Sequence, residues 1–183
     1  YLAGFITVLF KINTSDIQRI IDHLISLKKR KGRLFLIGIG GSAANCSHAV
    51  NDFRKICNIE AYTPVDNVAE LTARANDDGW NTIFSNWLKG SNLNQKDAVF
   101  VLSVGGGDIK KNISTNIVEA LKYAKLKKST ILGIISRDGG FTQKVADAIV
   151  LIPQLSNDTI TPYAETFQAV IWHAIVNYPE LRG

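Results

Sequence analysis

Two histidines, each near a carboxylate in a helical segment, are the side chains of this sequence whose types and spacing could do chemistry. His48 and Asp52 stand four residues apart in a segment with helical spacing, so they lie on one helix face. An imidazole and a carboxylate placed in this way can bind a metal ion or form an acid–base pair. The other interpretation is a surface histidine beside an ordinary salt bridge with Arg54 or Lys55. The spacing alone favours this second interpretation.

The other histidine, His173, lies in an apolar run close to the end of the chain. In such surroundings each ring nitrogen needs a partner, so the residue is a core histidine, a metal ligand or a proton shuttle. Glu165 precedes it by eight residues, which is about 12 Å along a helix. That spacing does not by itself bring the two side chains together.

A glycine turn stands immediately before the helix of the first histidine. The apolar run 33–37 predicts a buried strand, and the turn 38–42 follows it. Gly40 and Gly41 let the chain bend sharply and approach a ligand, and the first amides of the next helix attract an anion. Ser42 is an N-cap or a hydroxyl donor to a bound oxyanion. The turn lacks the dinucleotide fingerprint, which argues against a nicotinamide dehydrogenase.

A second glycine loop follows the most apolar strand, and it begins with Ser103 and runs through Gly105, Gly106 and Gly107 to Asp108. Two glycine turns at neighbouring strand ends strengthen the case for phosphate or sugar contact. A carboxylate repels a phosphate dianion, so we expect the aspartate either to touch the ligand or to cap the next helix and point away.

The elements that must position these residues alternate between strands and helices along the whole chain. The pattern predicts an α/β fold, a three-layer sandwich with a five-stranded parallel sheet between helices. Ligands of such sheets bind beyond the carboxyl ends of the strands, so both glycine loops fall at the binding edge. The predicted strands are 34–37, 59–63, 97–103, 130–135 and 148–152, and the predicted helices are 15–30, 43–57, 67–75, 80–89, 113–126, 141–146 and 162–177.

The length of 183 residues suits one domain, 1–183, with a helical segment 1–31 and an α/β core 32–183. The apolar first ten residues predict a packing helix, which would suit a subunit contact. The chain begins at Tyr1 instead of methionine, so we expect that further residues precede it.

Composition excludes several classes of protein. The net charge of +5 suits an anionic small molecule but is too diffuse for nucleic acid. The one basic cluster, 28–31, ends a helix and faces water. No apolar run reaches the roughly 18 residues of a membrane span. Cys46 and Cys57 fit no zinc or redox motif, and we interpret them as reduced thiols of a cytoplasmic protein.

Several segments together resemble one family. Gly38-Ile39-Gly40-Gly41-Ser42-Ala43 with His48 is similar to the first loop and helix of sugar isomerase (SIS) domains, in particular phosphoheptose isomerases. Two further segments match the family in the same way: residues 76–79, which are followed by 83–85, and Asp138-Gly139-Gly140 after the fourth strand. The resemblance covers nearly the whole chain. It implies the flavodoxin-like SIS fold, with the N-terminal helices in oligomer contacts.

The resemblance also implies an activity and a site. Phosphoheptose isomerases convert sedoheptulose 7-phosphate to D-glycero-D-manno-heptose 7-phosphate through a cis-enediol, as homotetramers with sites at subunit interfaces, and several bind zinc. By this resemblance Asp52 is the base and His173 its partner acid. A zinc or other divalent ion would be held by His48, Asp52, Glu165 and His173. The substrate-binding positions are Gly40, Gly41, Ser42, Asp77, Ser103, Gly105, Gly106, Gly107, Asp108 and Glu165.

Three positions depart from the family pattern. The family has Asn where this chain has Ile39, a loop rich in Ser and Thr where this chain has 103–108, and an Asp where Pro162 stands. Most hydroxyl donors to a phosphate are therefore absent, which favours a sugar other than the one that the family prefers. The alternative function is a non-catalytic SIS module, either a phosphosugar sensor or a tetrameric adaptor. The retained histidines and carboxylates favour the enzyme.

Overall fold

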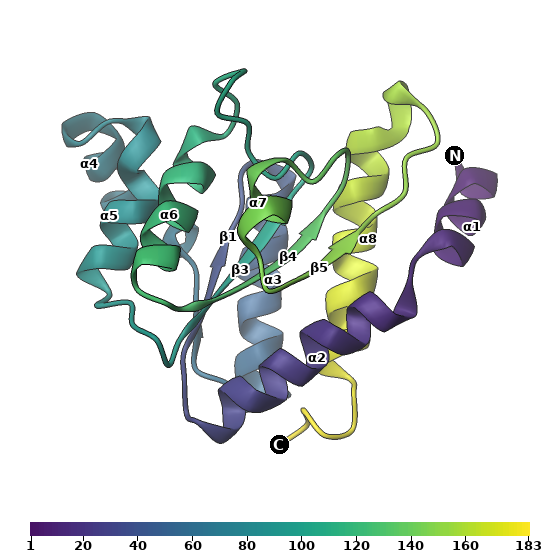
Figure 1. Cartoon of the computed structure of the whole chain (residues 1–183), viewed down its shortest axis with the longest axis horizontal. Coiled ribbons are helices and arrows are strands. Elements are labelled where there is room, and N and C mark those ends of the chain that lie inside the picture. The colour runs from purple at the N-terminus through teal and green to yellow at the C-terminus, as the bar shows by residue number, and fades with distance from the viewer.

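The computed structural model describes all residues 1–183, and its centre is a sheet of five parallel strands in the order β2-β1-β3-β4-β5 (Figure 1). This order and the helices on both faces confirm the predicted α/β class. The strands are β1 (Leu34–Ile37), β2 (Ala61–Tyr62), β3 (Ala98–Ser103), β4 (Thr130–Ile135) and β5 (Ala148–Leu151).

Helices connect the strands and form the two outer layers. They are α1 (Leu2–Lys11), α2 (Thr14–Lys29), α3 (Gly41–Lys55), α4 (Val68–Asp77), α5 (Ile83–Gly90), α6 (Thr115–Leu126), α7 (Gly140–Val145) and α8 (Ile160–Val176). Three short 3₁₀ turns, η1 (Pro64–Asp66), η2 (Trp80–Thr82) and η3 (Asn157–Thr159), complete the list. No helix is long and apolar enough to cross a membrane.

Alternating side chains of the strands give the sheet two apolar faces. Leu34 and Leu36 of β1 belong to the core beneath α2, α3 and α8, whereas Phe35 and Ile37 belong to the core beneath α5 and α6. This alternation is what a strand buried on both faces requires. It produces the three layers visible in Figure 1, with α3 and α8 packed together on one side.

The order of the strands explains where the loops meet. β1 pairs with both β2 and β3, so the chain reverses its winding direction between β1 and β3. In sheets of this order the crevice at that reversal is the ligand-binding position. The two glycine loops, which follow β1 and β3, are therefore neighbours at the carboxyl edge, as predicted.

Several predicted boundaries are wrong at the caps. Asn13, not Ser15, caps α2, because its side chain accepts a hydrogen bond from the Ser15 amide at 3.0 Å. Gly40 occupies the cap position of α3, so Ser42 lies inside the first turn. The second strand pairs only over Ala61–Tyr62. The sixth helix begins at Thr115 instead of 113, since residues 108 and 113 form an antiparallel bridge before it.

The N-terminal helix packs against the last helix through aromatic rings. Tyr1 stacks on Tyr163, and Phe5 stacks on Phe167, with centroids 4.7 and 4.6 Å apart. The first ten residues therefore form the packing helix that their apolar character predicted, and it lies on α8.

Candidate active site

Three side chains from α3 and α8 converge where these helices pack. His48, Asp52 and His173 each offer a ligand atom within 4.8 Å of the other two. Asp52 Oδ2 lies 3.8 Å from His48 Nε2 and 3.6 Å from His173 Nε2. The carboxylate is nearly buried, while both imidazoles are half exposed. This is a polar centre with an open side, and His173 is not a core histidine.

Neighbouring groups fix the orientation of these side chains. Asn51 Nδ2 donates to Asp52 Oδ1 at 2.9 Å, which leaves Oδ2 toward the imidazoles. His173 Nδ1 lies 2.8 Å from the carbonyl oxygen of Ala169, so it carries the proton and Nε2 keeps its lone pair. The buried Trp172 ring stacks beside His173 and meets His48 edge-on, with centroids 3.6 and 4.7 Å away.

These three residues fit a divalent metal ion. Two ligands at about 2.1 Å in a tetrahedral site lie about 3.4 Å apart, close to the separations between the carboxylate and the two imidazoles. The backbone carbonyl that holds His173 Nδ1 is the usual outer partner of a metal-bound histidine. Three protein ligands with an open position are typical of catalytic zinc sites.

The structure places Glu165 away from this cluster, beside the start of α3. A Cβ atom added to Gly41 would come within 2.5 Å of the Glu165 carboxyl carbon, so the glycine leaves the space that this carboxylate occupies. The main-chain oxygen of Glu165 also accepts a hydrogen bond from Asn45 at 2.9 Å. The positive end of the α3 dipole therefore faces a carboxylate of the protein.

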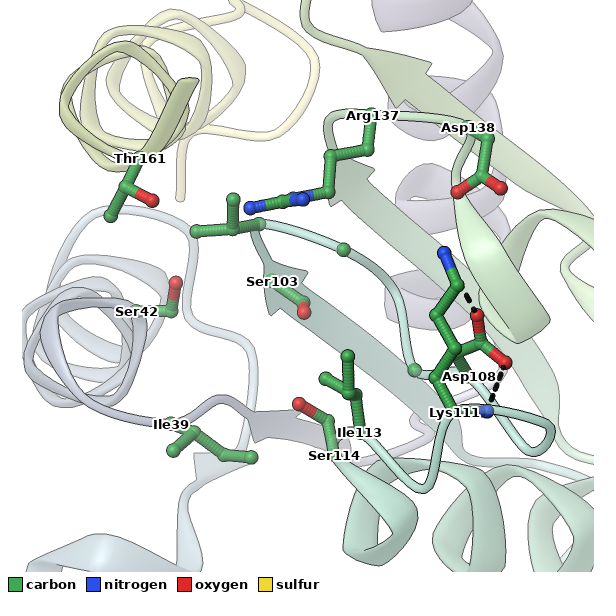
Figure 2. A pocket seen from close by; sticks show the side chains of 13 residues that line it. Ile39, Ser42, Ser103, Asp108, Lys111, Ile113, Ser114, Arg137, Asp138 and Thr161 are labelled. Atoms are coloured by element: carbon green, nitrogen blue, oxygen red, sulfur yellow. Dashed lines mark hydrogen bonds and ion pairs between the residues drawn. The ribbon is translucent and has the colours of Figure 1, made fainter. Parts of the chain in front are cut away.

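A cavity of about 300 Å³ opens at the carboxyl edge of the sheet (Figure 2). Four of its residues carry hydroxyl groups and come from different elements: Ser42 in α3, Ser103 at the end of β3, Ser114 before α6 and Thr161 in α8. The cavity thus gathers donors from both glycine loops and from the first turn of α8. Its size and polarity suit one phosphorylated sugar terminus.

The serines of the cavity differ in whether their hydroxyl groups already form hydrogen bonds within the protein. Ser42 Oγ accepts a hydrogen bond from Gln168 Nε2, and Ser103 Oγ accepts one from the amide of Gly106, both at 3.0 Å. Each hydroxyl proton remains free for a ligand. Ser114 makes no side-chain cap bond at the start of α6, so its hydroxyl lines the cavity without a partner in the chain, whereas the Ile117 amide already donates to Asn116 Oδ1 at 2.9 Å.

The second glycine loop serves packing more than ligand contact. The carbonyl oxygen of Gly106 accepts bonds from the amide and the hydroxyl of Thr142, at 2.9 and 2.8 Å. The carbonyl oxygen of Gly107 accepts one from Phe141 at 2.7 Å. A Cβ atom on Gly106 would collide with the backbone of Gly139. These glycines let the loop after β3 lie against the loop after β4, while Gly105 and Gly107 still line the cavity.

Asp108 does not cap a helix, contrary to one of the two sequence interpretations. Its Oδ1 accepts hydrogen bonds from the amides of Lys110 and Lys111, at 2.8 and 3.0 Å, and closes the hairpin that ends at Ile113. The amide of Lys111, the amide of Lys110 and the charges of Lys111 and Lys144 hold the pKa of this carboxyl below its usual value. It lines the cavity as an ionised group.

The structure leaves Asp77 and Gly40 outside the cavity lining. Asp77 ends α4 and accepts a hydrogen bond from Asn76 at 2.8 Å, and α4 lies across the sheet from α8 (Figure 1). Gly40 turns into α3 with a positive φ of 62° and open space beside it. Within one chain, Asp77 therefore does not meet the other candidates, whereas Gly40 adjoins Gly41 and Ser42 without lining the cavity.

Sequence reasoning missed Ser114 and Arg137, which both line the cavity. Neither belongs to a recognisable motif. The signal for Ser114 would have been the hairpin at 108–113, which moves the start of the helix two residues along the chain, from 113 to Thr115. Arg137 directly precedes the recognised Asp138-Gly139-Gly140 segment, and its place at the end of β4 was the available hint.

Comparisons with known proteins place this geometry in a family. No model of a known protein family matches the chain. A phosphoheptose isomerase of Trichlorobacter lovleyi is 30% identical over 151 residues, which cover 80% of this chain and 72% of that protein. The chain belongs to the phosphoheptose isomerase family. Phosphoheptose isomerase 1 of Campylobacter jejuni is also 30% identical, over 81% of this chain and 78% of that protein.

Solved structures agree on the fold. The phosphoheptose isomerase of Neisseria gonorrhoeae superposes with a TM-score of 0.83 at 21% identity, covering 96% of this chain and 93% of that one. The phosphoheptose isomerase of Francisella tularensis gives the same TM-score of 0.83 at 20% identity. The predicted SIS fold is thereby confirmed, and membership of the phosphoheptose isomerase family makes the chain an isomerase.

Proposed function

We propose that this isomerase converts sedoheptulose 7-phosphate to D-glycero-D-manno-heptose 7-phosphate. The observation that carries the proposal is the convergence of His48, Asp52 and His173 within 4.8 Å, in a chain of the phosphoheptose isomerase family. The reaction moves one proton from C1 to C2 and one from the C1 hydroxyl to the C2 oxygen. Its atoms balance without a redox partner.

Asp52 is the base of this reaction. A C–H beside a carbonyl is a weak acid, so a positioned carboxylate must take the proton from C1, exchange it with solvent at the open side of the site, and deliver a proton to C2. The hydrogen bond from Asn51 to Oδ1 keeps Oδ2 directed at the open side of the site. Its low exposure, 12% of the side chain, limits competition from water.

His173 is the partner acid that moves the proton between the two substrate oxygens. Its Nδ1 is held by the Ala169 carbonyl, so Nε2 is the nitrogen available to the substrate. A base and an acid on different helices can reach opposite ends of the C1–C2 bond, and Asp52 and His173 come from α3 and α8.

The same three side chains would hold a divalent ion, with zinc favoured by two imidazoles and one carboxylate. Because one atom cannot coordinate an ion and carry a proton at the same moment, Asp52 and His173 would act as base and acid only when their Oδ2 and Nε2 atoms are released from the ion. When bound, such an ion acts as a Lewis acid toward the carbonyl and enediol oxygens of the substrate. Glu165 is the fourth ligand implied by the family resemblance. We assign it instead to substrate binding, because it lies at the start of α3 on the cavity side of the cluster.

The substrate fits between the cavity and the cluster. Ser42 precedes His48 by six residues, which is about 9 Å along α3. An extended seven-carbon sugar phosphate has a similar length. The phosphate then lies in the hydroxyl-lined cavity, and C1 and C2 lie beside the imidazoles.

We further propose a homotetramer with sites at subunit interfaces. Leu2, Ile6 and Phe10 of α1 are 79%, 55% and 84% exposed, although the opposite face of this helix packs on α8. An apolar stripe of this kind suits a second copy of the chain, and the distant Asp77 could then reach a neighbour's site. The two free, buried cysteines suit a reducing cytoplasm.

The test is turnover of sedoheptulose 7-phosphate, followed by the aldose signals in the proton NMR spectrum. We expect formation of heptose 7-phosphate by the wild type and almost none by H48A or H173A. Turnover that survives both substitutions would refute the site. A folded, zinc-free protein that converts no phosphorylated ketose would support the non-catalytic sensor instead.

A further inference from the structure

The cavity at the carboxyl edge contains one cation that no lining residue neutralises. Two basic side chains line it, Lys111 and Arg137. Lys111 Nζ faces Asp108 Oδ2 at 3.9 Å. Arg137 has neither a hydrogen bond nor an ion pair with any other lining residue, and its guanidinium extends above Ser103 in the direction of Thr161 (Figure 2). A guanidinium left free inside a hydroxyl-lined cavity is suited to an oxyanion.

The two helix and glycine features that usually attract an anion are already engaged in this protein. The first turn of α3 faces the carboxylate of Glu165, which opposes a second negative charge there. In the loop after β3, the Gly106 amide donates to Ser103 Oγ at 3.0 Å. Neutral hydroxyls alone would leave a phosphate dianion next to Glu165 and Asp108 without a compensating charge.

The backbone around Arg137 is fixed, so the side chain is presented from a rigid position. The preceding residue, Ser136, donates its amide to Val104 O at 3.1 Å and its hydroxyl to Ile152 O at 2.9 Å. Arg137 itself has a positive φ of 54°, a conformation that glycine adopts more readily. A Cβ atom at Gly105 would lie 3.5 Å from Arg137 Cδ, so the guanidinium arm rests on the glycine loop.

We propose that Arg137 binds the phosphoryl group of the substrate and makes the site selective for phosphorylated over unphosphorylated sugars. The identity of the sugar rests on the proposed function, but the anion site does not. The bidentate geometry of the guanidinium matches two phosphoryl oxygens, and Ser42, Ser103 and Ser114 supply the remaining donors. Arg137 is thus a specificity-determining residue at the end of the substrate opposite the reacting carbons.

The experiment compares R137Q, R137K and R137G with the wild type. Inorganic phosphate is titrated by calorimetry, and KM and kcat are measured with sedoheptulose 7-phosphate. We expect R137Q to raise the dissociation constant for phosphate and the KM about 10- to 100-fold, the usual effect of losing a hydrogen bond to a charged group. R137K should recover part of the loss. The kcat should change less than about threefold, because the phosphate is remote from C1 and C2.

The R137G variant separates the effect of Arg137 on phosphate binding from its effect on the stability of the fold. Glycine relieves the positive φ, so this variant should melt at the wild-type temperature or above it and still bind phosphate as weakly as R137Q. R19Q is the control for total charge: Arg19 lies on α2, where it pairs with Asp16 at 2.7 Å, and this change should leave both constants unaltered.

The outcomes distinguish this proposal from the function on which it rests. If the wild type turns over sugar and R137Q keeps its KM and its affinity for phosphate, the role of Arg137 is refuted and the isomerase stands. If no sugar is turned over and phosphate still binds in an Arg137-dependent way, the anion site stands without the isomerase. A drop in melting temperature or subunit assembly for all three variants, with phosphate binding unchanged, would assign Arg137 to structure instead.

Discussion

The two edges of the sheet carry similar polar residues and use them in opposite ways. At the amino edge, Asp97 is 2% exposed, and its two oxygens accept hydrogen bonds from Arg33 and Asn94. The Arg33 guanidinium also donates to Ser91 O and Asn92 O, at 2.9 and 3.1 Å. The hydrogen bond that the Arg33 guanidinium donates to Asp97 raises the pKa of Arg33. Every group in this network has a partner within the chain.

At the carboxyl edge and along the helices below it, several polar groups lack such partners. Arg137 and Ser114 face the cavity, and His48 and His173 meet Asp52 only at 3.6 to 3.8 Å. The same residue types therefore connect loops at the amino edge and remain available to a ligand at the carboxyl edge. The comparison teaches that the completeness of pairing, more than the residue type, separates a structural network from a site.

The largest expected effect is on catalysis at the open cluster. D52N and H173A should each lower kcat/KM by about 10³-fold or more, because each removes a proton-transfer group. With metal removed by a chelator, the free energy of unfolding should hardly differ between these variants and the wild type, since neither side chain completes a structural network. Steady-state kinetics and urea denaturation check this pair of results. A variant that unfolds in step with its loss of activity would break the comparison.

The reverse effect is expected at the amino edge. D97N should lower the free energy of unfolding by about 3 kcal/mol, because it removes the charge at the centre of a buried network. Activity per folded molecule should be retained. Denaturation in urea and kinetics at a temperature where the variant is still folded measure the two quantities. Unchanged stability would show that the paired network is not structural.

Removal of a metal ion tests the same difference between the open cluster and the paired network at the amino edge. Dialysis against a chelator should abolish turnover, and added zinc should restore it. An ion present at about 100 times its dissociation constant contributes about 2.7 kcal/mol of stability by mass action, so the melting temperature should fall as well. D52N should show neither the chelator-induced shift nor bound metal by mass spectrometry. Full activity in the chelated wild type would exclude a required ion.

The smallest effects come from single hydroxyls. S114A should raise KM about 3- to 10-fold with no change in stability, because its hydroxyl has no partner in the fold. The matched change is T142V: the Thr142 hydroxyl donates to Gly106 O at 2.8 Å in the interior, so its loss should cost about 1 kcal/mol of stability. If both variants altered KM equally and left stability alone, the distinction between paired and free hydroxyls would fail.

The sequence predicted the sheet and the site residues to different extents. The strands and amphipathic helices followed from apolar periodicity, and the neighbouring glycine loops followed from the strand order of such sheets. The cap predicted at Ser15 was wrong, because the choice between adjacent polar residues depends on a single hydrogen bond. At α3 the cap position falls on Gly40, so of the two interpretations of Ser42 only the hydroxyl donor remains. The packing role of Gly106 could not be inferred, since its partners Gly139 and Thr142 come from a loop more than thirty residues away.

The candidate cluster could not be predicted from residue spacing alone. His48 and Asp52 share a helix face, and the distance between them follows from the sequence alone. His173 reaches them only through the packing of α8 on α3, which no local pattern encodes. Glu165 was grouped with the ligands by resemblance, but its place beside Gly41 depends on the same packing. Arg137 carried no motif, so only the cavity revealed it.

The most direct test of the account is the transfer of solvent hydrogen to the substrate in deuterium oxide. Sedoheptulose 7-phosphate is incubated with the wild type, D52N and H173A, and deuterium at C2 of the aldose product is read by NMR. The account predicts one deuterium per turnover for the wild type and none above background for either variant. Unlabelled product from the wild type, or undiminished labelling by both variants, would contradict proton transfer at the His48–Asp52–His173 cluster.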